Sequence, residues 1–214
     1  IDTLISHHKT DGLRFNACTI NTLIVDEAHH LILDNKFHKL SVELKNCQVI
    51  GFTATPCRAD GASLSRTKQG IFDELIQSKL LKNDSVNILI QQGFLSDFVC
   101  YRMKDDNIEK GVLAQKAYKA YKKYANSSRC IVFCETISNA DLIQEEFRRA
   151  GVSCDVIHSN KTQAHIKEIM DNFEHNNIKV LCSVDMIGEG YDCPAVDAVI
   201  LMRPTSSFGL HRQQ

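Results

Sequence analysis

The chain has 214 residues, of which 43% are hydrophobic and 24% are charged, and its formal net charge is −1. This composition is that of an ordinary globular protein and excludes a disordered chain, a collagen and a disulfide scaffold. The length suits two domains of ordinary size, and the near-zero net charge means that any nucleic-acid binding depends on local patches and backbone amides.

Cysteine usage and hydropathy predict an intracellular, cytoplasmic protein. The nine cysteines are odd in number, and several lie in apolar runs, as Cys130, Cys134 and Cys182 do. A reduced thiol in such a run behaves as a small core hydrophobe, and the spacing of Cys130 and Cys134 does not suit a zinc knuckle. No window approaches the ~20 apolar residues of a membrane span, so we expect no contact with a membrane. The chain begins with Ile1 rather than Met, which suggests that it starts within a longer protein.

Short apolar runs alternate with stretches of helical period, which is typical of parallel strands joined by helical crossovers. Strands are expected, in chain order, at 22–26, 48–53, 130–134, 154–158, 179–184 and 195–202. Helices are expected where apolar residues recur every three or four positions, over 111–125, around 140–150 and around 166–173. The lysines of the first of these helices are expected to form a solvated face, with phosphate contact as the alternative. The sequence therefore predicts an α/β fold.

A boundary between two α/β units is expected near the middle of the chain. Periodicity fades and charge rises between Gly93 and Gly111. We place a first domain at residues 1–100, a linker at 101–108 and a second domain at 109–214.

The run "VDEAHH" ends the strand expected at 22–26 with two acids and two histidines. In an open parallel sheet, ligands bind outside the carboxyl ends of the strands. There, Asp26 can hold Mg²⁺ through water, and Glu27 can orient and activate a water for attack on a phosphoryl group. Taken alone, the two acids are equally consistent with the start of a helix. A zinc hydrolase is disfavoured, because its H-E-x-x-H motif needs histidines four residues apart and His29 and His30 are adjacent.

Two further motifs follow expected strands. In "GFTATP", the hydroxyls of Thr53 and Thr55 can bridge the backbone and the neighbouring acids. In "SVDMIGEGYDCP", Gly188 and Gly190 allow the backbone to approach a ligand, and Asp192 can accept a hydrogen bond from a ribose hydroxyl. Each motif is weak evidence in isolation.

Together the motifs resemble superfamily 2 helicases and translocases of the DEAD/DEAH type, and in particular the DNA-directed branch. The order "LIVDEAHH", "GFTATPCRADG", "CIVFCETISNA", "VLCSVDMIGEGYDCPAVDAVILMRPT" and "HRQQ" covers nearly the whole chain. The resemblance implies two RecA-like parallel-sheet domains, the first represented by its C-terminal part. It also implies ATP and Mg²⁺ as cofactors, and a nucleic-acid strand, expected to be DNA, as partner.

The resemblance assigns roles by position. Asp26 would bind Mg²⁺ and Glu27 would be the catalytic base, while His29, Thr53 and Thr55 would couple the nucleotide state to the strand. The residues expected at the nucleotide from the second domain are Gly188, Gly190, Asp192 and, near the γ-phosphate, Gln213. Those expected at nucleic-acid phosphate are Thr136 and Ser183.

Two parts of the family pattern do not occur within these 214 residues. None of the ten glycines belongs to G-x-x-x-x-G-K-[ST], the loop that cradles phosphates, and the last motif stops at Gln214 before its Gly-Arg and further arginine. We therefore expect the chain alone to show no significant ATPase activity. Two alternatives remain open: a non-hydrolytic module that binds nucleic acid or protein, and an RNA-directed helicase.

Overall fold

The computed structural model describes residues 20–31, 47–54, 57, 63–66, 70–76, 85–102, 110–188, 191 and 193–203. The described residues fall into two compact units, the first ending at Val99 and the second beginning at Cys100. The assignment of residues 1–100 and 109–214 to a first and a second domain remains a prediction. Each unit is described separately.

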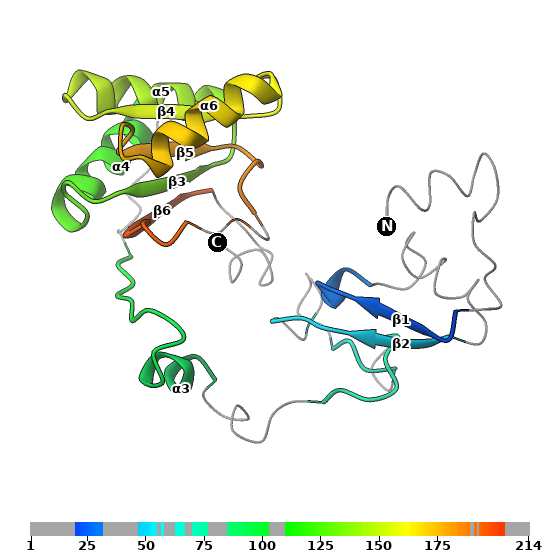
Figure 1. The fold of residues 1–214 in the computed structure, drawn as a ribbon. Helices are drawn as coiled ribbons and strands as arrows, with labels where there is room; N and C mark the ends of the chain where they lie inside the picture. The colour runs from blue at the N-terminus through cyan, green and yellow to red at the C-terminus, as the bar shows by residue number, and fades with distance from the viewer. Residues whose placement is uncertain are drawn as a thin grey trace. The chain divides into compact units, whose positions relative to one another are not determined.

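The first unit is built on two parallel strands, β1 (Thr22–Val25) and β2 (Gln48–Gly51), which lie side by side in Figure 1. Their register runs from the pair Thr22 and Gln48 to the pair Val25 and Gly51. A single 3-10 turn, η2 (Ala28–His30), follows β1. Val25, Ala28 and Leu31 are buried, which anchors the end of β1 and the turn.

A short helix, α3 (Ser85–Gln91), lies in the same unit and was not expected from the sequence. It ends at Gln91, and Gly93, two residues further on, has a φ of 76°, the left-handed conformation that glycine adopts after helix C-termini. The N–H of Gly93 donates to the Ile90 carbonyl and that of Phe94 to the Leu89 carbonyl. The signal for this helix end was therefore present in the sequence as a glycine after an apolar run.

The second unit is a four-stranded parallel sheet with helices on both faces, in the strand order β4-β5-β3-β6. Its strands are β3 (Cys130–Cys134), β4 (Cys154–Ile157), β5 (Val180–Ser183) and β6 (Ala198–Met202). Its helices are α4 (Lys110–Tyr124), α5 (Ile137–Arg149) and α6 (Gln163–Glu174). The expected strands and the three expected helices are confirmed, with ends that differ by at most three residues.

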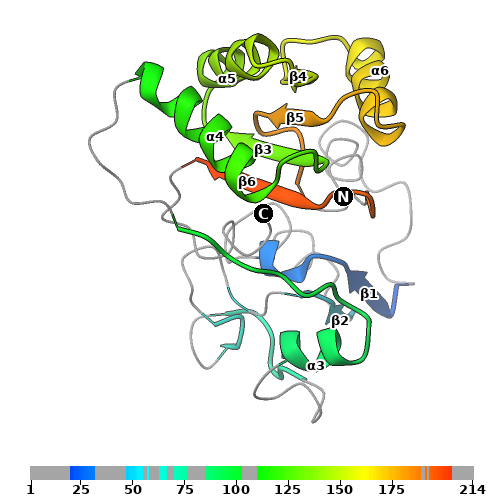
Figure 2. The same ribbon diagram turned by 90° about the vertical axis from the view of Figure 1, so that its left-hand side faces the viewer.

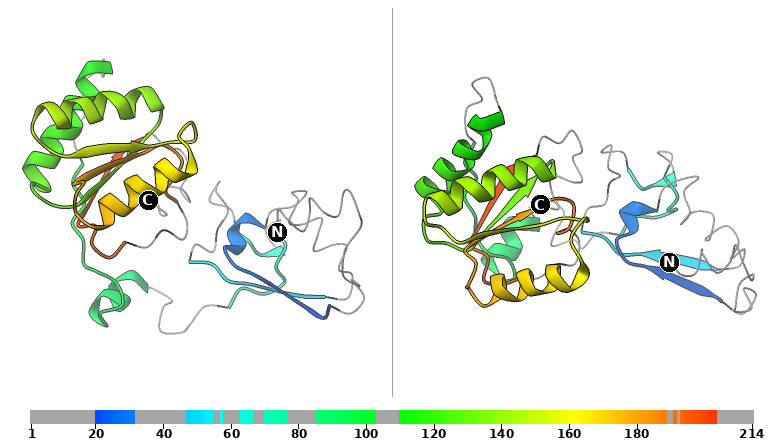
Figure 3. Two further views of the ribbon diagram at one scale, coloured as in Figure 1. Left: turned by 45° about the horizontal axis from the view of Figure 1, so that its top comes forward. Right: turned by 90° about the horizontal axis from the view of Figure 1, so that it is seen from above.

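The two-residue period of the strands divides the core of this unit into two layers. On one face, α4 and α5 pack on alternate residues of the strands, such as Cys130 and Val132. On the other face, α6 packs on the intervening residues, such as Ile131 and Phe133. Figures 2 and 3 show α4 and α5 on one side of the sheet and α6 on the other.

The three cysteines expected in the core, Cys130, Cys134 and Cys182, are confirmed there, and Cys154 joins them. Cys130, Cys134, Cys154 and Cys182 are all buried between the sheet and the layer of α4 and α5. The Sγ atoms of Cys154 and Cys182 lie 3.8 Å apart as thiols. Burial raises the pKa of the Cys130 thiol to about 12, so this group stays protonated at neutral pH.

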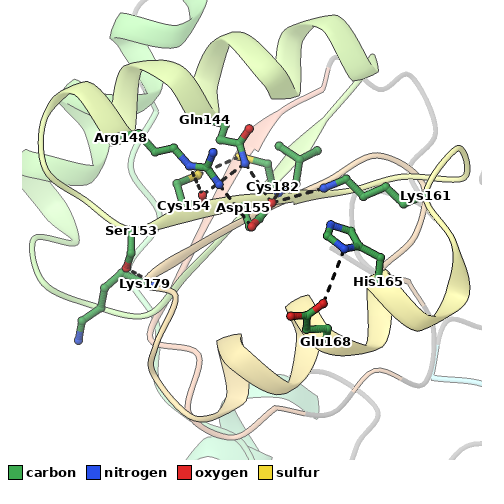
Figure 4. Close-up of polar contacts among 11 residues, drawn as sticks. Gln144, Arg148, Ser153, Cys154, Asp155, Lys161, His165, Glu168, Lys179 and Cys182 are labelled. Carbon is green, nitrogen blue, oxygen red and sulfur yellow. Dashed lines mark hydrogen bonds and ion pairs between the residues drawn. The ribbon is translucent and has the colours of Figure 1, made fainter.

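The edge strand β4 is held by a carboxylate that three side chains contact (Figure 4). Asp155 accepts hydrogen bonds from Gln144 Nε2 at 3.0 Å, from Arg148 Nη2 at 3.3 Å and from Lys161 Nζ at 3.4 Å. Arg148 Nε also donates to the Cys154 carbonyl at 2.9 Å. Side chains thus occupy the Cys154 carbonyl, an acceptor that an edge strand would otherwise offer to another strand.

Within the described residues, no helix is both long and apolar enough to cross a bilayer. The same residues hold no group of three or more His, Cys, Asp or Glu side chains arranged to bind a metal ion.

Candidate functional site

The acid pair lies where β1 gives way to η2. Phe52 donates its N–H to the Val25 carbonyl at 2.8 Å, and Ala28 donates its N–H to the Phe52 carbonyl at 2.9 Å. These two bonds tie the residues around the pair to the continuation of β2. Asp26 and Glu27 are therefore held at the carboxyl end of the sheet, where the sequence predicted them.

The backbone turns sharply at the acid pair. Glu27 has φ 50° and ψ 49°, a left-handed conformation that is uncommon for a residue other than glycine and that costs about 1–3 kcal/mol. One oxygen of Asp26, Oδ1, accepts the Glu27 N–H at 2.9 Å. Asp26 is exposed and the Glu27 side chain is 40% exposed, so both carboxylates are accessible from solvent. The second oxygen of Asp26 is thus placed to meet a hydrated cation.

His29 connects the acids of β1 to the end of β2. Its Nδ1 lies 2.9 Å from Thr53 Oγ1 and 3.4 Å from Glu27 Oε2. The side chain is only 6% exposed, because η2 turns it inward, whereas the neighbouring His30 is exposed. The structure thus brings together His29 and Thr53, two of the three residues expected to couple nucleotide and strand. Thr55, the third, lies outside the described residues.

Gly51 is a site residue that the sequence analysis did not assign. A Cβ at this position would lie 2.6 Å from the Ala28 Cβ and 2.6 Å from the Phe72 ring. No side-chain carbon fits at that distance, so only glycine lets the end of β2 pass this close to η2. The glycine at the start of "GFTATP" was the available signal, but its neighbours in space were not readable from the sequence.

In the second unit, Thr136 and Ser183 lie at the same edge of the sheet. Ser183 ends β5 and pairs in register with Phe133 of β3, and Thr136 follows β3 as the N-cap of α5. Thr136 is exposed, and its Oγ1 accepts the Asn139 N–H at 3.2 Å. Ser183 is 1% exposed, and its Oγ accepts the Ile187 N–H at 3.0 Å. This geometry favours direct ligand contact for Thr136 and a turn-positioning role for Ser183.

Three of the four nucleotide residues expected in the second unit, Gly188, Gly190 and Asp192, follow β5 in the sequence. Gly188 is exposed, and an added Cβ would meet no atom within 4 Å. Gly190, Asp192 and Gln213 lie outside the described residues. Asp185, which has a left-handed φ of 53°, forms an ion pair with Arg203 just after β6. This pair was not expected from the sequence, and it ties the turn after β5 to the end of β6, with β3 between the two strands in the sheet.

A small pocket of about 180 Å³ lies under this turn. Its lining is mostly apolar and consists of Ile131, Phe133, Ile187, Gly188, Tyr191, Cys193, Val196 and Val199. The Tyr191 hydroxyl is buried, and this desolvation raises its pKa well above the ordinary value. An apolar pocket with a neutral phenol does not suit a triphosphate.

Two family models match the chain. Residues 1–58 match the model described as type III restriction enzyme, res subunit. Residues 113–214 match the helicase conserved C-terminal domain.

Two relatives match across most of the chain, and a third matches about a third of it. A 51.5 kDa protein of a Lactococcus phage is 27% identical over 212 residues, which are 90% of this chain and 44% of the relative. The "Putative ATP-dependent helicase IRC3" of Saccharomyces cerevisiae is 26% identical over 219 residues, covering 92% of this chain and 31% of the relative. The ATP-dependent RNA helicase cgh-1 of Caenorhabditis elegans is 30% identical over 73 residues, 34% of this chain and 17% of the relative. The chain thus spans less than half the length of these relatives.

Among solved structures, Dbp5 of S. cerevisiae bound to RNA and ADP BeF3 has a TM-score of 0.51 at 14% identity. The match covers 97% of this chain and 50% of that chain. It supports the fold alone, which is α/β with two RecA-like parallel-sheet units. The two family models and the helicase relatives support the resemblance of this chain to superfamily 2 helicases.

Proposed function

We propose that this chain is part of an ATP-dependent DNA helicase or translocase that couples ATP hydrolysis to movement along a strand. The observation that carries the proposal is the contact between His29 Nδ1 and Thr53 Oγ1 beside the acid pair. It links the end of the strand that bears the acids to the end of the neighbouring strand, as a nucleotide-sensing element requires.

The acids divide the work in this proposal. Asp26 would hold Mg²⁺ through water, and the ion when bound would supply positive charge against the phosphate oxygens. The donor set fits the ion, because Mg²⁺ prefers oxygen ligands and Asp26 is exposed with one oxygen outside the bond to the Glu27 amide. Glu27, with its side chain 40% exposed, orients the attacking water and accepts its proton.

His29 and Thr53 couple the position of the acid pair to the end of β2. Because Nδ1 of His29 lies near both Glu27 Oε2 and Thr53 Oγ1, a movement of Glu27 changes which of the two it bonds. Thr53 moves with the end of β2, and Thr55 is assigned the same coupling role from the motif.

The second unit supplies the other contacts. Thr136 binds nucleic-acid phosphate with its exposed hydroxyl, and Ser183 orders the turn beside it. The residues assigned to the nucleotide from this unit are Gly188, Gly190, Asp192 and Gln213.

Replacement of the base in the complete protein tests the proposal. Glu27→Gln should lower DNA-stimulated ATP hydrolysis by about 10²–10⁴-fold while leaving nucleotide binding in place, because general-base catalysis contributes that much. Glu145→Gln, an exposed position on α5, is the matched control and should leave the rate unchanged. Hydrolysis that survives Glu27→Gln would contradict the role given to this residue.

The 214-residue chain by itself should hydrolyse no ATP, since it contains no G-x-x-x-x-G-K-[ST] loop to hold the phosphates. A DNA-stimulated rate above that of the same chain with Glu27→Gln would refute this expectation. If the complete protein also lacks such a loop and shows no hydrolysis, the non-hydrolytic module becomes the better description.

An RNA-directed helicase is the second candidate. It is favoured by the match to cgh-1, whose name describes an RNA helicase. DNA is favoured by the likeness of "TATPCRADG" to DNA-directed members and by the match of residues 1–58 to a restriction-enzyme subunit. Stimulation of ATP hydrolysis by DNA and RNA strands of the same sequence decides between them.

A further inference from the structure

Two tyrosines form an exposed stack at the end of α4. The ring centroids of Tyr101 and Tyr124 lie 4.1 Å apart with an interplanar angle of 19°. Tyr101 is 58% exposed and Tyr124 is 42% exposed. The Nζ atom of Lys123 lies 4.8 Å from the centroid of the Tyr124 ring. Large aromatic surface is thus open to solvent next to a positive charge.

The helix that carries this stack is basic on its exposed side. Its 15 residues include five lysines and no acid, in a chain whose net charge is −1. Ala114, Ala117 and Tyr121 are buried on one side of the helix, while Lys119 and Lys122 are exposed on the other. The adjacent Tyr124 side chain raises the pKa of Lys123, so the ammonium of Lys123 stays charged over a wide pH range.

The end of α4 that carries Tyr124 is anchored to the core of the unit by Tyr121. The ring centroids of Tyr121 and Phe147 lie 5.3 Å apart in an edge-to-face arrangement. The Tyr121 hydroxyl donates to the Ser128 carbonyl at 3.1 Å. The short turn after Tyr124 leads directly to Cys130, the first residue of β3. The tyrosine pair therefore lies at the amino end of the sheet, whereas Thr136 and Ser183 lie at its carboxyl end.

From these observations we infer that Tyr101, Tyr124 and the lysines of α4 form an accessory binding surface for single-stranded nucleic acid. A base stacks on the open face of Tyr101, and the phosphates on either side meet Lys119, Lys122 and Lys123. Stacked aromatics flanked by positive charge bind single strands without regard to sequence, because every base has a π-face. The surface needs no ATP, and within the second unit it lies at the opposite end of the sheet from Thr136 and Ser183.

The chain is well suited to a direct test, because it has no tryptophan and only five tyrosines. The probes are oligo(dT) and oligo(U) of about 12 nucleotides, within the length that one binding module covers. They are added without nucleotide, and tyrosine emission and probe anisotropy are followed. Base stacking on Tyr101 should partly quench the emission, and the anisotropy should rise at low salt.

Tyr101→Leu should remove most of the quench and weaken binding about 5-fold or more. Replacing Lys119 and Lys122 by Gln should leave the quench at saturation but lower the slope of log affinity against log salt, by about 0.7 for each phosphate that is no longer neutralised. Lys167→Gln, an exposed lysine on α6, is the matched control and should change neither value.

The replaced side chains are exposed, so thermal unfolding should confirm that the variants fold normally. Binding and quenching that are the same in Tyr101→Leu as in the unchanged chain would overturn the inference, as would a salt slope that the lysine replacements do not alter. Because no ATP is present, this result is independent of whether Glu27→Gln abolishes hydrolysis.

Discussion

Both units of this chain contain parallel strands, but the strands of the second unit are more deeply buried than those of the first. In the second unit, every residue of β3 and β5 is buried and helices cover both faces of the sheet. In the first unit, Ile24 on β1 is 66% exposed and Phe52, just after β2, is 59% exposed. Parallel sheets are normally buried on both faces. The proposed catalytic residues, Asp26 and Glu27, thus lie on the unit whose described strands are less buried.

The difference shows what holds each site in place. Around the acid pair, position is set by two backbone hydrogen bonds, the contact of His29 with Thr53 and the close approach at Gly51. In the second unit, position is set by a packed core in which Ile143 and Phe147 are fully buried. Replacements in the two units should therefore lower the free energy of unfolding by different amounts.

The largest difference is expected for core truncation. Phe147→Ala should lower the free energy of unfolding of the second unit by about 3–5 kcal/mol, because it empties a site with no exposed surface. Phe52→Ala, at a mostly exposed ring in the first unit, should cost about 0.5 kcal/mol. Urea unfolding followed by circular dichroism measures both. Equal costs would show that the two units are packed alike.

A smaller effect is expected from filling the close approach in the first unit. Gly51→Ala should destabilise that unit by about 1–3 kcal/mol, since its Cβ would overlap Ala28 and Phe72 and force them apart. Hydrogen exchange at the amides of Ala28 and Phe52 reports the local loosening. Gly188→Ala is the control, because an added Cβ there meets nothing within 4 Å. Unchanged exchange in Gly51→Ala would contradict the close packing.

Raising the pH should weaken the second unit through its buried thiols. Desolvation raises the pKa of Cys130 from 9.0 to about 12, so the folded state keeps the thiol neutral while the unfolded state ionises. This contribution is complete below pH 9 and is lost progressively between pH 9 and 12, by about 1 kcal/mol at pH 10. Urea midpoints at pH 8 and pH 10 under reducing conditions measure the loss. The same pH slope in Cys130→Ala would rule out this thiol as the cause.

The smallest effect on stability is expected at the coupling contact. Thr53→Val removes the hydroxyl that His29 meets and should cost about 0.5 kcal/mol, at the low end for a hydrogen bond because Glu27 lies nearby. In the complete protein, Thr53→Val should reduce the distance moved along the nucleic-acid strand for each ATP hydrolysed. Thr53→Ser keeps the hydroxyl and should restore both properties. Full movement per ATP in Thr53→Val would contradict the coupling role.

Much of the fold followed from the sequence because strand and helix periods are local properties. The apolar run of β3 and the buried faces of α5 and α6 were readable from neighbouring residues. The short helix α3 was not, because its seven residues carry too little periodicity to separate it from a loop. The placement of the acids at a strand end followed from the rule for parallel sheets.

The amino-acid sequence by itself determined the strands, the helices α4, α5 and α6, the resemblance to superfamily 2 helicases, and which residues carry acids, hydroxyls and glycines at strand ends. Tertiary structure alone decided that His29 reaches Thr53, that Gly51 is needed against Ala28 and Phe72, that Ser183 is buried, and that Tyr101 stacks on Tyr124. These are contacts between residues distant in the chain. Their distances depend on how the elements pack, and no local pattern of side chains encodes that packing.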